Sequence, residues 1–65
     1  MKNNFRVLLA KQRKKVSDVH KATSIAKSTL IALYYERTKR PDIETLLKIA
    51  NYLGVSIDEL LTPEE

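Results

Sequence analysis

An all-α fold of five short helices is predicted by three features of this 65-residue sequence. Apolar residues recur at intervals of three and four, no segment alternates with a period of two, and the chain contains a single glycine. By its length the chain forms one domain, so we expect residues 1–65 to share one core. Such a small domain buries only about 60% of the surface of its unfolded chain, so its core has to be efficient.

The first three helices are predicted over residues 4–13, 16–22 and 26–36. Asn3 or Asn4 is available as the N-cap of the first helix. About three residues join the second helix to the third, which is typical of a helix-turn-helix. The inward faces are predicted to carry Phe5, Leu8, Leu9 and Gln12, then Val16, Val19 and Ala22, and then Leu30, Leu33 and Tyr34.

A loop over residues 36–42 precedes two more helices, predicted over residues 43–53 and 57–61. Pro41 cannot continue a helix, and Asp42 is placed to cap the next one. Gly54, the only glycine, stands where a helix ends in the left-handed conformation. Ser56 and Glu59 form a capping box, and Pro63 ends the last helix. The fourth helix is predicted to bury Ile43, Leu46, Leu47, Ala50 and Leu53.

The composition argues against an enzyme. The chain has no cysteine and one histidine, and its carboxylates show no metal-binding spacing. It has no glycine-rich phosphate loop. We therefore expect no catalytic residue, no metal, no cofactor and no small-molecule ligand. The opening segment has no uninterrupted apolar run, so we also expect no signal peptide, no membrane association and a cytoplasmic location.

The net charge of +4 is unevenly distributed along the chain. Residues 1–41 contain eleven of the twelve Lys and Arg residues and only two acids, which gives +9. Residues 42–65 contain one lysine and six acids, which gives −5. A basic part joined to an acidic part indicates one surface for a polyanion and another for a different role, although an uneven solvated surface would show the same pattern.

The outward face of the third predicted helix is unusual for a solvated surface. On a helical wheel Lys27, Ser28, Ile31, Ala32 and Tyr35 share one arc, which has one cation and no acid. Lysine can donate to the acceptor edge of guanine, serine can donate or accept, and apolar side chains can contact thymine methyl groups. We therefore predict that Lys27, Ser28, Ile31 and Ala32 read bases in the major groove, while noting that a single exposed isoleucine is common in proteins.

Basic segments flank this helix-turn-helix on both sides. "KQRKK" (11–15) precedes the second helix and "RTKR" (37–40) follows the third. Cations in these places would hold the DNA backbone and fix the register without reading sequence. The start of the second helix also offers free N–H groups to a phosphate. The predicted phosphate-binding residues are Lys14, Lys15, Val16, Tyr35, Arg37, Thr38, Lys39 and Arg40.

From "VSDVHKATSIAKSTL" to "TKRPDIETLLKIANYLGVSIDELL", the chain resembles the lambda-repressor/Cro family of helix-turn-helix domains, also called the Xre family. The likeness covers about residues 5–61 and implies a five-helix domain that binds double-stranded operator DNA, usually as a dimer. It implies base contacts from Lys27, Ser28, Ile31 and Ala32. It further implies phosphate contacts from the Val16 backbone and from Lys39 and Arg40 in the loop.

Five positions depart from the family pattern. Ser24 stands at the usual turn glycine, Ala26 at the usual Ser or Thr cap, and Glu36 at the usual Gly or Asn that ends the third helix. His20 replaces a small residue that packs between the two helices, and Val16 replaces a glutamine. Either Ser24 adopts a left-handed backbone, or the turn is remodelled and Ser24 helps to cap the third helix.

Two functions remain open at this stage. The first is a sequence-specific transcriptional regulator, by family default a repressor, which forms a homodimer on a two-fold symmetric operator. The alternative is a protein-binding module on the same scaffold, such as an antitoxin. The acidic C-terminal third and the apolar Ile57, Leu60 and Leu61 would form either the homodimer interface or the partner surface.

Overall fold

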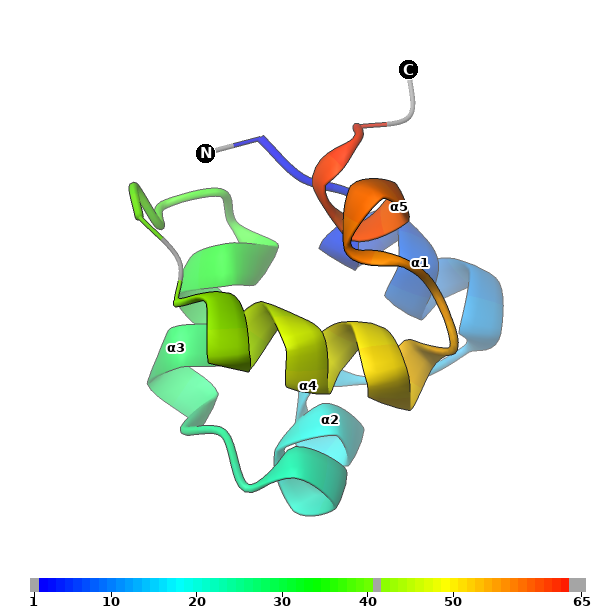
Figure 1. Ribbon diagram of the computed structural model, residues 1–65. Helices are drawn as coiled ribbons and strands as arrows, with labels where there is room; N and C mark the ends of the chain where they lie inside the picture. Colours follow the sequence, from blue (N-terminus) through cyan, green and yellow to red (C-terminus); the bar gives the residue numbers. More distant parts are fainter. Residues whose placement is uncertain (1, 41, 64–65) are drawn as a thin grey trace.

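The computed structural model describes residues 2–40 and 42–63, and confirms the predicted all-α architecture with no strand in those ranges. Its elements are α1 (Phe5–Gln12), α2 (Val16–Thr23), α3 (Lys27–Tyr34), α4 (Ile43–Leu53) and α5 (Ile57–Leu61) (Figure 1). Predicted and observed bounds differ by two residues at most, which is the ordinary uncertainty of helix ends. Pro41 lies outside the described residues, so its predicted role stays a prediction.

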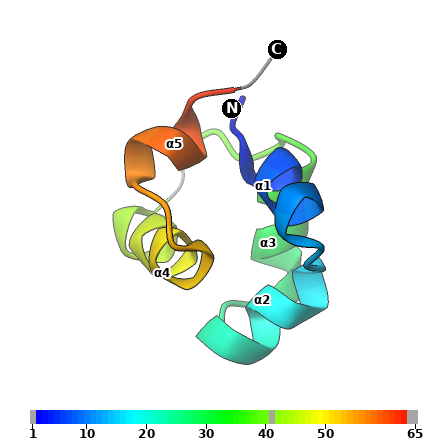
Figure 2. The same cartoon turned by 90° about the vertical axis from the view of Figure 1, so that its right-hand side faces the viewer.

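The helices form two groups around one core. Figure 2 shows α1, α2 and α3 on one side of the molecule and α4 and α5 on the other. The fourth helix contacts both α2 and α5, while α1 contacts α3 and α5. The first and last helices of the chain therefore pack against each other. None of the described helices is long and apolar enough to cross a membrane.

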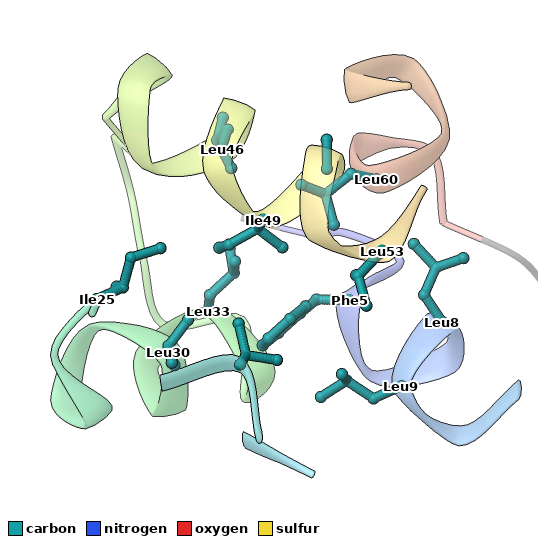
Figure 3. Close-up of a cluster of buried hydrophobic side chains, with 12 residues drawn as sticks. Phe5, Leu8, Leu9, Ile25, Leu30, Leu33, Leu46, Ile49, Leu53 and Leu60 are labelled. Atoms are coloured by element: carbon teal, nitrogen blue, oxygen red, sulfur yellow. The ribbon is translucent and has the colours of Figure 1, made fainter. Parts of the chain in front are cut away.

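The core is made of side chains from every helix (Figure 3). Phe5 is fully buried at its centre, and its ring meets the Tyr34 ring edge-on at a centroid distance of 6.4 Å. The buried apolar residues are Phe5, Leu8, Leu9, Val19, Ile25, Leu30, Leu33, Leu46, Ile49, Ala50, Leu53 and Leu60. The inward faces predicted for α1 and α3 are confirmed, with Gln12 and Tyr34 half-buried at the edge of the core.

Two predicted core faces were partly wrong. In α4, Ile43 and Leu47 are 61% and 45% exposed, whereas Ile49 is fully buried. The buried stripe consists of Leu46, Ile49, Ala50 and Leu53, and this spacing turns positions 43 and 47 to its flank. Ala22 in α2 is also exposed, and Val19 is the buried residue of that helix.

Four of the five described helices are followed by a residue with a left-handed backbone conformation. Gly54 has φ 71°, as predicted for the only glycine, and the N–H of Val55 donates to the Ala50 carbonyl. Arg13, Ser24 and Glu36 have φ values of 54°, 61° and 60° after α1, α2 and α3. Two of these helix ends have the same backbone hydrogen bond as the end at Gly54. The Lys14 N–H donates to the Leu9 carbonyl after α1, and the Arg37 N–H donates to the Ala32 carbonyl after α3.

The predicted N-caps of the last two helices form, and of the capping box predicted at α5 the hydrogen bond to Ser56 is present. The Asp42 carboxylate accepts from the Glu44 N–H at 3.3 Å, and the Ser56 hydroxyl accepts from the Glu59 N–H at 3.1 Å. The first helix is different, because Asn4 occupies the N-cap position without a side-chain cap. Asn3 instead accepts from the Phe5 N–H at 2.8 Å and donates to the Leu33 carbonyl at 2.9 Å.

Candidate DNA-binding surface

The turn between α2 and α3 is built by its own side chains. Ser24 is left-handed at φ 61° and ψ 13°, which confirms the first of the two predicted alternatives for this residue. Thr23 donates from its hydroxyl to the Val19 carbonyl at 2.6 Å and accepts from the Ile25 N–H at 3.3 Å. Ile25 is buried in the core. The backbone therefore reverses direction at a fixed point, without a glycine.

His20 also stabilises this turn. Its Nδ1 lies 2.7 Å from the Ile25 carbonyl oxygen. A carbonyl only accepts, so the ring carries a proton on Nδ1 and donates it. The larger side chain at this position replaces small-residue packing with a hydrogen bond that ties α2 to the turn. This role for His20 was missed, because the sequence showed only that a larger side chain stands where the family has a small one.

The third helix starts without a side-chain cap. Ala26 is at the N-cap position with φ −57° and ψ 139°, and has no hydroxyl to accept from the first turn. Beyond it Lys27 and Ser28 are exposed, Ile31 is 41% exposed and Ala32 is half-buried. The four candidate base-reading residues therefore share the outward side of α3, while Leu30 and Leu33 hold the opposite side in the core.

The candidate phosphate-binding residues divide into two groups. The first lies along a hollow of about 350 Å³ between α1, the start of α2 and α3, which we name the α1–α3 groove. Its walls include Arg6, Ala10, Lys15, Val16, Ile31 and Tyr35. At this end of α2, Asp18 accepts from the Lys15 N–H at 2.8 Å. The N–H groups of Val16 and Ser17, in the first turn, have no carbonyl within the helix to receive them.

The second group lies in the loop after α3. Arg37, Lys39 and Arg40 are exposed and Thr38 is half-buried. The Arg37 guanidinium lies 5.3 Å from the centre of the Tyr35 ring, which is itself 58% exposed. Thr38 and Arg40 also line a smaller hollow of about 120 Å³ with Thr29 of α3. The loop therefore begins beside the outward face of α3.

Lys14 is the candidate whose surroundings differ most from the prediction. Its side chain is half-buried, and its ammonium lies 4.3 Å from the centre of the Tyr52 ring in α4. A cation over an aromatic face is stabilised there. Although the stem of Lys14 lines the α1–α3 groove, its charge is directed toward α4.

A comparison with protein families matches the Cro/C1-type helix-turn-helix DNA-binding domain over residues 4–65. The chain belongs to this family. A comparison with curated proteins finds no match. The family assignment agrees with the observed order of five helices, and it makes this Cro/C1-type domain a DNA-binding domain.

One residue predicted for the partner interface of this Cro/C1-type domain is excluded by the fold. Leu60 is fully buried, because α5 turns it into the core beside α1 and α4, so its side chain offers no surface to a partner. Ile57 and Leu61 are half-buried at the edge of the core. Among the described residues, the most exposed large apolar side chain is instead Ile43 of α4, which was predicted to lie in the core.

Proposed function

We propose that this Cro/C1-type domain is a sequence-specific transcriptional regulator, a repressor, that reads the major groove of double-stranded DNA with α3. The observation that carries the proposal is the composition of the outward side of α3. Lys27, Ser28 and Ile31 are exposed there at the start of the helix, with basic groups at both flanks. Such a surface offers donors and a methyl contact to base edges, and cations to the two backbones beside them.

The second part of the proposal is a homodimer. Ile43 and Leu47 expose large apolar side chains on α4, and Ile57 and Leu61 of α5 are only half-buried. A dimer would match a two-fold symmetric operator with half-sites about 34 Å apart, or a multiple of that distance. The same apolar side chains also support the alternative of a protein-binding module, so the DNA experiment has to separate the two functions.

The experiment is selection of bound sequences from a random duplex pool, followed by binding measurements on the selected duplex. Lys27→Ala is expected to relax the selected motif at one base pair, with a loss of about 1–3 kcal/mol of discrimination. Lys39→Ala is the matched control, because it removes a loop cation and should weaken all sequences alike.

Two results would contradict the proposal. An unchanged motif with Lys27→Ala would show that α3 does not read that base. Weak binding by the wild-type domain that does not respond to salt would instead favour the protein-binding module, because DNA binding through several phosphates falls steeply as salt rises.

A further inference from the structure

The α1–α3 groove brings a cation from the first helix to the candidate DNA-binding surface. Arg6 lies on α1, outside both basic segments of the sequence, yet it shares this groove with Lys15 at the start of α2 and Tyr35 of α3. Its side chain is exposed, and no carboxylate pairs with it among residues 2–40 and 42–63. None of the described residues that line the groove is acidic.

We propose that one strand of the duplex lies along the α1–α3 groove and that Arg6 binds one of its phosphates, next to the phosphate held at the start of α2. This inference rests on the proposed function. It extends the DNA-contacting surface from the helix-turn-helix onto α1, and makes Arg6 a positioning residue that holds the backbone without reading bases.

The chemistry of the groove fits a sugar-phosphate backbone. Such a backbone alternates an apolar deoxyribose face with an anionic phosphate. The groove offers both kinds of contact, because the apolar Val16 and Ile31 line it together with the cations Arg6 and Lys15. A guanidinium has five N–H donors in a planar fork and can bind two phosphate oxygens at once.

The shape of the first helix also leaves room for the strand. Ala10 is one helical turn after Arg6 on the same wall of the groove, and it is exposed. Its small side chain lets a backbone approach α1 closely. At the opposite wall, Tyr35 is 58% exposed and carries a hydroxyl that can donate to a phosphate oxygen.

The test uses Arg6→Gln and the duplex selected by the wild-type domain. Glutamine keeps a polar side chain and good helix propensity, so α1 should remain folded. Lys48→Gln is the matched control, since it removes one positive charge from an exposed position on α4, outside the groove. Arg6→Lys keeps the charge and is the rescue variant.

Arg6→Gln is expected to weaken selected and random duplexes alike, about tenfold, as for loss of one charge-assisted contact. The slope of log K against log salt should become shallower by about 0.9, the value for one phosphate. Ethylation of one phosphate at the outer edge of the half-site should block the wild-type domain and no longer affect Arg6→Gln. Arg6→Lys should restore the wild-type slope, and Lys48→Gln should keep both the slope and the ethylation pattern.

The proposal is overturned if Arg6→Gln retains the wild-type salt slope and ethylation pattern, whether or not its affinity falls. It is also overturned if Arg6→Gln binds DNA normally but no longer binds an acidic polypeptide such as polyglutamate, since the groove would then be a peptide site. Failure of the proposed function looks different, because the wild-type domain itself would then select no sequence.

Discussion

At the scale of single residues, this domain ends helices with side chains that rarely adopt positive φ. Arg13, Ser24 and Glu36 take the left-handed conformation that glycine occupies at lower cost. For an L-residue this conformation costs about 1–2 kcal/mol. The surrounding hydrogen bonds, such as that from the His20 ring to the Ile25 carbonyl, hold the turn in this conformation. The sequence contains the turn, but without the glycine that usually marks it.

Ser24→Gly is expected to stabilise the domain by about 0.5–1 kcal/mol, because relief of the left-handed strain exceeds the added entropy of the unfolded chain. Urea unfolding followed by circular dichroism measures the change. Lys21→Gly is the control, since it places glycine inside α2 and should destabilise by about 1 kcal/mol. Equal losses in the two variants would mean that Ser24 is not strained.

At the scale of elements, the helices differ in how their first turns are satisfied. The fourth and fifth helices have side-chain caps from Asp42 and Ser56, and the second has the Asp18 carboxylate on the Lys15 N–H. The third has none, although it is the helix that carries the candidate base-reading residues. Its stability therefore depends on Leu30 and Leu33 in the core, and not on local capping.

Ala26→Ser is expected to raise the free energy of unfolding by about 1 kcal/mol, because a hydroxyl at this extended N-cap position can accept from the first turn of α3. Ser56→Ala makes the converse change at α5 and should lower it by a similar amount. Both are measured by urea denaturation. If Ser56→Ala destabilises while Ala26→Ser has no effect, α3 does not begin in a geometry that a serine can cap.

At the scale of the whole molecule, two buried asparagines join the first helix to distant parts of the chain. Asn3 bonds the Leu33 carbonyl at the end of α3, and the Asn4 N–H donates to the Leu60 carbonyl of α5 at 2.7 Å. The Asn4 Oδ1 is buried without a hydrogen-bond partner among the described residues. These bonds close the bundle where α1, α3 and α5 meet.

Asn3→Ala is expected to destabilise the domain by about 2–3 kcal/mol, because it leaves a buried carbonyl and a buried N–H without their partner. That is a large fraction of the roughly 5–15 kcal/mol by which domains are stable. Asn51→Ala is the control at an exposed position in α4, where alanine should be neutral or slightly stabilising. Thermal unfolding of both variants measures the difference, and a neutral Asn3→Ala would contradict the role assigned here.

The sequence by itself determined the five helices, the cap at Asp42, the end at Gly54 and the basic flanks of α3. These depend on residues close together in the chain, so spacing and local chemistry are enough to predict them. Only the tertiary structure decided which apolar residues of α4 and α5 enter the core. It buried Leu60 and Ile49 and exposed Ile43, and it placed Arg6 beside α3. These outcomes depend on contacts between distant segments, and periodicity gives the direction of a helix face but not what packs against it.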